Sequence, residues 1–219
     1  MKKIPNFLFF LGLLLPNLGW DPIEKEYTTW NVYGGSKENI RYSKLREIDT
    51  SNVIHLEKAW EFRTQDHDQY TQIQVNPIII DKVLFGVSPK LKLFALDAAT
   101  GLQKWLFDPY KVAPHEIQGA GYFSMNVCRG VTYYSDPNSK RIFYAAGSNL
   151  FCIDATTGLP ISSFGEKGRL DLHNDLDRDA SQLYIAMTSP GIIYKDLIII
   201  GSRVNEGAVA APGYIRAYD

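Results

Sequence analysis

The side chains that commonly bind metal ions or form covalent bonds are few in this sequence and widely spaced. The four histidines, His55, His67, His115 and His173, stand at irregular intervals. Metal sites built from histidine and cysteine need their ligands at short, regular spacings. We therefore expect these histidines to lie on the surface rather than in a metal cluster.

The two cysteines, Cys128 and Cys152, leave two alternatives open. In an exported protein they could form a disulfide. However, Cys152 stands in the segment FCID, where the related segment FALD has an alanine. This exchange favours a small, buried core residue over a disulfide partner.

The two related segments belong to a repeat. The structural units formed by this repeat must position the residues of any functional site in the chain. LFALDAATG begins at Leu93, LFCIDATTG begins at Leu150, and YIRAYD ends the chain, so that the shared Asp residues are 57 and 65 residues apart. In the first two copies the alternating apolar residues predict a strand, the Asp can accept bonds from the amides of the next turn, and the Gly can adopt a positive φ, whereas the third copy stops at its Asp. After the first copy, Trp105 begins the next strand and offers a flat face to a neighbouring sheet.

A repeat of this length is typical of a β-propeller blade of four strands. The fold class predicted is therefore all-β, with about three blades. The elements expected are a short helix at 51–58, strands at 59–64, 76–88, 90–97, 131–134, 141–145, 149–153, 189–202 and 213–219, and irregular insertions at 106–126 and 159–187. Asp81-Lys82 is expected to form a hairpin turn between the two apolar runs of 76–88. Because propellers close with four to eight blades, we expect the sequence to be the N-terminal part of a longer protein.

The first 19 residues are predicted to be a secretory signal peptide. Lys2 and Lys3 precede a mostly apolar run that is too short to favour a membrane-spanning helix. An uncleaved N-terminal anchor is the alternative. The signal predicts a periplasmic or extracellular protein whose propeller domain occupies residues 20–219. The net charge of −1 excludes the basic field of a nucleic-acid-binding protein.

Several segments together resemble a known family. WNVYGG, RYSKL, NPIIIDKVLFGVSPKLKLFALDAATG, CRGVTYY, TSPGIIYKDLIIIGS and APGYIRAYD occur in the order found in dehydrogenases that depend on pyrroloquinoline quinone (PQQ). The resemblance covers essentially the whole chain after the signal and is closest to the membrane-associated glucose/quinate type. It implies an eight-bladed propeller in the periplasm, with PQQ and a divalent metal, Ca²⁺ or Mg²⁺, near the ring axis.

The resemblance also implies a reaction. A sugar or alcohol hydroxyl is oxidised while a carboxylate base takes its proton, PQQ accepts the hydride, and the metal acts as a Lewis acid. The electrons then pass to a quinone or to cytochrome c, in association with the membrane. The catalytic base and most metal ligands are expected beyond Asp219, so the chain alone is expected to be inactive.

Five residues match positions at the family's cofactor site. Arg129, in CRGVTYY, is expected beside the quinone oxygens, where a guanidinium suits the anionic cofactor. Glu206, after a strand end, is expected to bind the metal, because hard cations take carboxylate oxygens. Arg203 in the same loop, the hydroxyl of Thr188 in TSPG, and the amide of Gln74 in QVNP are the further candidates for PQQ contacts.

Two departures from the family pattern narrow these expectations. Methanol-oxidising members stack PQQ under a disulfide between adjacent cysteines, whereas this chain has Cys128 alone in that loop. Some glucose-oxidising members carry a histidine four residues before the arginine, and here that position is Met125. Glucose itself is therefore in question as the substrate.

A second function remains open from the sequence. A non-catalytic periplasmic propeller that binds other proteins would need the repeated Asp-x-x-Thr-Gly turn and the tryptophan. Such a scaffold would have no use for CRGVTYY or for a glutamate after the GS loop, and the presence of both favours the enzyme.

Overall fold

The computed structural model describes residues 27–113 and 127–219. The expected signal peptide at 1–19, together with His115 and Met125, lies outside the described residues. Strands and irregular segments make up nearly all of this part of the chain, in agreement with the all-β prediction. Within it, no helix has the length and apolar character needed to cross a bilayer.

The first sheet contains four antiparallel strands in sequence order: β1 (Ile78–Ile80), β2 (Val83–Val87), β3 (Leu93–Asp97) and β4 (Gln103–Phe107). The predicted hairpin turn between β1 and β2 is confirmed, since Asp81 and Lys82 both have positive φ, 50° and 65°. Two consecutive positive φ angles are the signature of the tight turn that matches the twist of a hairpin.

The second sheet has the same plan: β5 (Thr132–Asp136), β6 (Ser139–Ala146), β7 (Asn149–Asp154) and β8 (Arg169–Asp171). The first three strands agree with the prediction. The fourth, β8, lies within 159–187, which the sequence analysis treated as irregular. That prediction was wrong for β8 and also for β9 (Ile185–Ala186), because strands of three and two residues are too short to show an alternating apolar pattern.

The third sheet has three strands among the described residues, and a two-stranded sheet lies beside it. The remaining elements are β10 (Ile192–Tyr194), β11 (Leu197–Ile200) and β13 (Arg216–Tyr218) of the third sheet, β9 (Ile185–Ala186) and β12 (Arg203–Val204) of the small sheet, and the 3-10 helices η1 (Val53–His55) and η2 (Pro109–Lys111). The helix expected at 51–58 is thus reduced to the single turn η1, whose cap residue Asn52 makes no side-chain capping bond.

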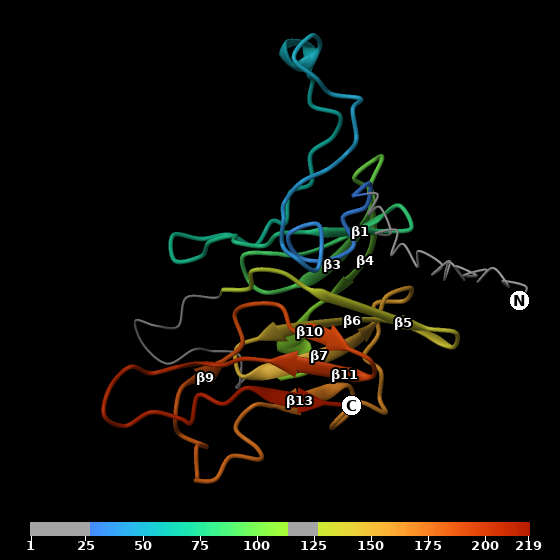
Figure 1. Cartoon of the computed structure of the whole chain (residues 1–219). Coiled ribbons are helices and arrows are strands. Elements are labelled where there is room, and N and C mark those ends of the chain that lie inside the picture. The colour runs from blue at the N-terminus through green and yellow to red at the C-terminus, as the bar shows by residue number, and fades with distance from the viewer. Residues whose placement is uncertain (1–26, 114–126) are drawn as a thin grey trace, which may run out of the picture.

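The three sheets stack in sequence order, which is the arrangement of propeller blades (Figure 1). One apolar core lies between the first and second sheets and includes Phe85, Trp105 and Tyr144. Another lies between the second and third sheets and includes Phe143 and Ile198. The second sheet is therefore covered on both faces, which explains why five of the six residues of β7 are buried.

The two cysteines lie in different cores. Cys128 belongs to the core between the first and second sheets, and Cys152 to the core between the second and third. Both are buried free thiols. The expectation of a buried core residue at Cys152 is therefore confirmed, and the two cysteines do not form a disulfide with each other.

The repeated Asp-Thr-Gly turn is built in the same way twice. Asp97 Oδ1 accepts hydrogen bonds from the amide and hydroxyl of Thr100, at 3.0 and 2.9 Å. Asp154 Oδ1 accepts the matching bonds from Thr157, at 2.7 and 2.9 Å. Bonding to Thr100 lowers the pKa of the Asp97 carboxyl. The turn is thus held by its own side chains.

Each turn receives a tryptophan from the preceding unit. Trp105 Nε1 donates to the carbonyl of Ala155 at 3.1 Å, and a Cβ at Gly158 would lie 2.7 Å from the indole ring. Trp60 Nε1 donates to Ala98 O at 3.2 Å, and a Cβ at Gly101 would lie 2.6 Å from that ring. Only glycine leaves room for the indole at these positions, and its φ is positive in both.

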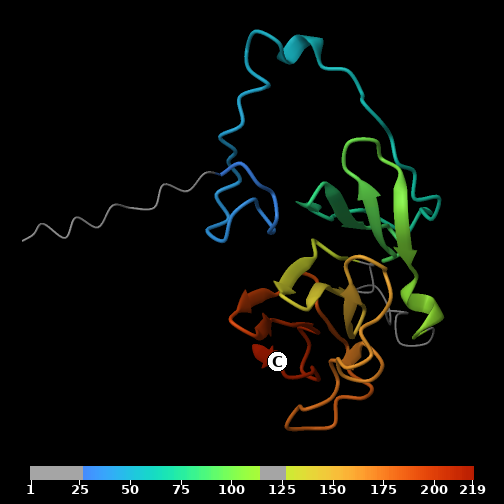
Figure 2. The same cartoon turned by 90° about the vertical axis from the view of Figure 1, so that its right-hand side faces the viewer.

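The N-terminal segment forms a long arm that leaves the sheets, reaches its tip at η1 and returns to the first sheet (Figure 2). On the return, residues 59–64 were predicted as a strand. They form no ladder, but burial alternates from Trp60 to Asp66, with even-numbered residues turned inward and odd-numbered ones exposed. The segment is therefore extended like a strand, although no other strand pairs with it among the described residues.

The expectation that all four histidines lie on the surface was wrong for His173. Its side chain is 20% exposed; Nδ1 lies 2.7 Å from Asp171 Oδ1, and Nε2 lies 3.0 Å from Leu183 O. These contacts tie β8 to the loop that leads into β9. His173 is thus a structural residue of the insertion, whereas His55 and His67 are exposed as expected.

Candidate functional site

The inner ends of the three units are joined by backbone hydrogen bonds. The amide of Asn76 donates to Arg129 O at 2.9 Å, and the amide of Arg129 donates to Thr188 O at 2.8 Å. Asn76 also forms a parallel bridge with Gly130. We call these linked segments, residues 74–76, 128–130 and 186–188, the inner edge. The first two segments end two residues before β1 and β5, and the third ends four residues before β10.

Arg129 and Thr188, two of the predicted cofactor residues, are in direct contact. Arg129 Nη1 donates to Thr188 Oγ1 at 2.8 Å, in addition to the backbone bond between the same two residues. Both side chains are partly buried. The backbone bond fixes the position of Arg129 beside Thr188, and the side-chain bond orients the guanidinium through one of its five N–H donors.

Gln74 lies at the same edge, two residues before Asn76. Its side chain is exposed and donates to Gln72 Oε1 at 2.9 Å. Asn76 is a residue that the sequence analysis missed: besides its backbone bond to Arg129, its Oδ1 accepts a bond from Trp30 Nε1 at 3.3 Å. The Asn-Pro pair, which punctuates a chain before a strand, was the available signal.

Arg203 reaches this region through the small sheet. It pairs with Ala186, two residues before Thr188, and is partly buried. The hydroxyl of the neighbouring Ser202 is buried and has no hydrogen-bond partner among the described residues. Gly201 is exposed, and no atom of residues 27–113 and 127–219 would come within 4 Å of a Cβ there.

Glu206 is placed differently from the other candidates. It lies in an exposed loop that follows β12. Among residues 27–113 and 127–219, no three Asp, Glu, His or Cys side chains gather where they could hold a metal ion. Because Ca²⁺ takes six to eight oxygen ligands, the described residues do not make up a metal site.

The donor set fits an anionic cofactor better than it fits a metal. The neighbouring segments carry the guanidinium of Arg129, a second arginine, a threonine hydroxyl, an amide, and a serine hydroxyl that has no partner among the described residues. Carboxylate groups are the ligands that such donors favour. The residues present therefore fit the carboxylate-bearing PQQ that the resemblance implies.

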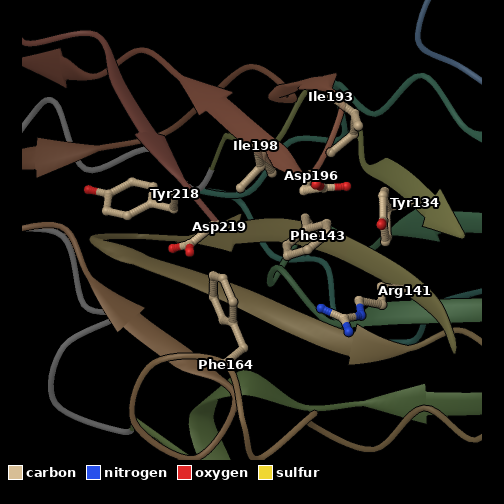
Figure 3. Close-up of a pocket in the computed structure, with 9 residues that line it drawn as sticks. All are labelled: Tyr134, Arg141, Phe143, Phe164, Ile193, Asp196, Ile198, Tyr218 and Asp219. Carbon is tan, nitrogen blue, oxygen red and sulfur yellow. The ribbon is translucent and has the colours of Figure 1, made fainter. Parts of the chain in front are cut away.

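Two cavities lie away from the inner edge, one in each contact between sheets. The cavity between the first and second sheets measures about 250 Å³ and is bordered by Trp105, Lys104 and Lys140. The cavity between the second and third sheets measures about 210 Å³. Figure 3 shows Arg141 and Asp219 on opposite sides of this second cavity, with Phe143 and Phe164 between them.

Sequence comparison finds the same family. The profile of the PQQ glucose/ethanol/alcohol dehydrogenase β-propeller domain matches residues 30–219. The quinoprotein glucose dehydrogenase of Escherichia coli K12 is 31% identical over 208 residues, which are 87% of this chain and 25% of the relative. The quinate/shikimate dehydrogenase (quinone) of Acinetobacter baylyi is 27% identical over 237 residues, which are 95% of this chain and 28% of the relative.

Solved structures show the same fold. The quinohemoprotein alcohol dehydrogenase from Comamonas testosteroni superposes with a TM-score of 0.68 at 23% identity, over 89% of this chain and 26% of that one. A europium-containing methanol dehydrogenase gives a TM-score of 0.61 at 24% identity, over 89% of this chain and 30% of that one. The chain spans about a quarter of the length of these relatives, and it belongs to the PQQ-dependent glucose/ethanol/alcohol dehydrogenase family, as a part of its β-propeller domain.

Proposed function

We propose that this chain supplies part of the PQQ site of a dehydrogenase that oxidises a sugar or alcohol hydroxyl. The observation that carries the proposal is the pair of Arg129 and Thr188 at the inner edge, which is joined by one backbone and one side-chain hydrogen bond. PQQ, when bound, supplies the quinone that accepts the electrons of the substrate. Relatives named for glucose, quinate/shikimate and alcohol oxidation support the substrate class.

The residues of this chain would bind and orient the cofactor. The guanidinium of Arg129, held by Thr188, would donate to an anionic oxygen of PQQ without first having to be ordered, which lowers the entropic cost of binding. Gln74 and Arg203 would add donors from the neighbouring segments. We place no proton transfer on this chain, because the catalytic base is expected beyond Asp219.

The metal, the electron acceptor and the cellular location remain predictions. Glu206 supplies one exposed carboxylate, so no step of the proposal depends on Ca²⁺ or Mg²⁺. We propose that a quinone or cytochrome c accepts the electrons, in association with the membrane. We also propose export to the periplasm, on the basis of residues 1–19.

Binding of PQQ by the purified chain tests the proposal. We expect PQQ to bind in equilibrium dialysis, and Arg129→Ala to weaken binding about 10- to 100-fold, because hydrogen bonds to a charged group are worth about 1.5–3 kcal/mol. Arg63→Ala, at an exposed arginine on the arm, is the matched control. Absence of PQQ binding by the unmodified chain would favour the non-catalytic scaffold.

Turnover has to be measured on a longer gene product, because the chain alone is expected to be inactive. A panel of aldoses and alcohols, with dye reduction as the readout and PQQ and Ca²⁺ added, would identify the substrate. A product that binds PQQ but oxidises none of these substrates would contradict the proposed reaction while leaving the binding site intact.

A further inference from the structure

The segment at 30–35, which lies outside the three repeated units, is anchored next to the inner edge. The amide of Ile79 donates to Trp30 O at 2.8 Å, and the two residues form an isolated antiparallel bridge. Trp30 Nε1 also donates to Asn76 Oδ1 at 3.3 Å. The segment is therefore fixed to the first unit, beside the residue whose amide bonds to Arg129.

A tight turn in this segment carries Tyr33. The amide of Gly35 donates to Val32 O at 3.0 Å, which closes a β-turn with Tyr33 at its second position. Gly35 has a φ of +82°, and a Cβ on it would lie 2.7 Å from the ring of Trp30. The anchored indole thus packs directly on the turn and holds it in place.

Tyr33 lies where the three units meet. It is partly buried, and a Cβ at Gly130 of the second unit would come 2.9 Å from Tyr33 Cδ2. The same Cβ would lie 3.4 Å from Asn76 O of the first unit and 3.4 Å from Pro190 Cγ of the third. The ring of Tyr33 therefore packs on Gly130 at the junction of all three units.

The glycine at 130 is explained by this contact and not by its backbone conformation. The φ of Gly130 lies outside the left-handed region, so an alanine could adopt it without strain. Distances of 3.4 Å leave room for a Cβ, whereas 2.9 Å from a ring carbon does not. The close approach of Tyr33 is what excludes a larger residue at this position.

Gly130 directly follows Arg129, whose guanidinium makes the main cofactor contact of the proposed function. The backbone of Arg129 is held by its bonds to Asn76 and Thr188. The next residue, Gly130, is held by the ring of Tyr33. A shift of Gly130 would move the backbone that carries the guanidinium, so the packing of Tyr33 bears on the direction of the Arg129 side chain.

We propose that Tyr33 is a positioning residue for the binding of PQQ by Arg129. Its ring holds Gly130, and the backbone at Gly130 keeps the guanidinium in the direction set by its bond to Thr188. The inference rests on the proposed function and adds to it a residue from outside the repeated units. Because the contact is made by a ring carbon, the ring and not the hydroxyl of Tyr33 is required.

The affinity of single variants for PQQ, measured by equilibrium dialysis, tests the inference. Tyr33→Ala should weaken PQQ binding about tenfold, which is within the range of coupling between neighbouring residues. Tyr33→Phe keeps the ring and should bind within about twofold of the unmodified chain. Tyr194→Ala, at a tyrosine of the third sheet that is 58% exposed, is the matched control and should leave the affinity unchanged.

Double variants separate positioning from simple packing. In the Arg129→Ala background, Tyr33→Ala should change the affinity for PQQ less than about twofold, because the guanidinium that it positions is absent. Gly130→Ala should weaken binding about fivefold by displacing the ring, and it should add no further loss to Tyr33→Ala. Urea unfolding of each variant without PQQ ensures that the affinities compare folded proteins.

Failure of this inference is distinguishable from failure of the proposed function. If the unmodified chain binds no PQQ, both are overturned. If it binds PQQ and Tyr33→Ala has the same affinity, or weakens binding equally with and without Arg129, the positioning role alone is overturned. If Tyr33→Ala does not fold, Gly130→Ala takes its place in the cycle with Arg129→Ala, and additive losses overturn the role in the same way.

Discussion

The contact between the first and second sheets differs from the contact between the second and third, although the same repeated turn stands beside both. In the first contact, β4 follows the turn at once and Trp105 docks on Gly158. In the second, the residues at the same distance from the turn are Ser-Ser-Phe at 162–164 instead of Trp-Leu-Phe, and β8 begins only at Arg169. There the ring of Phe164 packs edge-on against Phe143 at 5.5 Å. The repeat thus conserves the turn and varies the side chain that packs between the sheets.

The largest expected effect comes from removing the docked indole. Trp105→Ala should lower the free energy of unfolding by about 3 kcal/mol, as truncations of large aromatic residues do. Gly158→Ala should cost about 2 kcal/mol or more, because a Cβ would clash with the indole and because φ is +75°. Urea unfolding followed by circular dichroism measures both.

The double variant sharpens this comparison. With the indole removed, Gly158→Ala retains the cost of its positive φ but no longer clashes, so the two changes should be less than additive by about 1 kcal/mol. Gly201→Ala, next to open space, is the control and should change stability by less than about 0.5 kcal/mol. Additive costs would show that Trp105 and Gly158 do not act as a pair.

An intermediate effect on stability is expected from the two buried thiols when the pH is raised. Cys128 lies in the contact between the first and second sheets, and Cys152 lies in the contact between the second and third. Burial raises the pKa of Cys128 from 9.0 to about 11 and that of Cys152 to about 12. The unfolded chain releases these protons above pH 9, whereas the folded chain keeps them. Stability is therefore complete below pH 9 and should fall by about 1.4 kcal/mol per pH unit for each thiol until the pH reaches its folded pKa.

Single alanine variants assign this slope. Between pH 9 and 10.5, Cys128→Ala and Cys152→Ala should each make the fall of the unfolding free energy with pH shallower, by the amount that corresponds to one released proton. Urea unfolding at each pH measures this slope. Equal slopes in the unmodified chain and both variants would contradict the assignment of the raised pKa values to buried thiols.

The smallest effect is expected at the rim of the first contact. Lys140 Nζ lies 2.7 Å from Asp81 Oδ2, and this pairing raises the pKa of Lys140. Both side chains are exposed, at 51% and 69%, and exposed ion pairs contribute little to stability. Lys140→Ala should leave the urea midpoint unchanged in 0.15 M salt. A clear loss of stability would show that the rim, and not only the indole, holds the sheets together.

The sequence was sufficient to predict the elements that repeat. The alternating strands, the turn at Asp81-Lys82 and the Asp-Thr-Gly turns follow from local patterns, and the structure confirms them. The segment at 59–64 was predicted as a strand from the same kind of pattern. Its alternating burial agrees with that prediction, but the segment forms no ladder among the described residues, and a local pattern does not reveal whether a partner strand is present.

The candidate site was predictable in part. Arg129 and Thr188 were named separately, and their direct bond could not be foreseen, because it depends on how two units 59 residues apart meet. Asn76 was missed because its role is played mainly by its backbone amide, which every residue except proline possesses. The assignment of Gln74, Arg203 and Glu206 to cofactor or metal stays a prediction.

The backbone bonds along the inner edge have a consequence for evolution. Asn76, Arg129 and Thr188 join the three units through main-chain atoms, so these links survive when the side chains change. Side chains of the inner edge can then be exchanged by mutation at little risk to the assembly of the units. One scaffold can in this way be adapted to new substrates while its architecture is inherited unchanged.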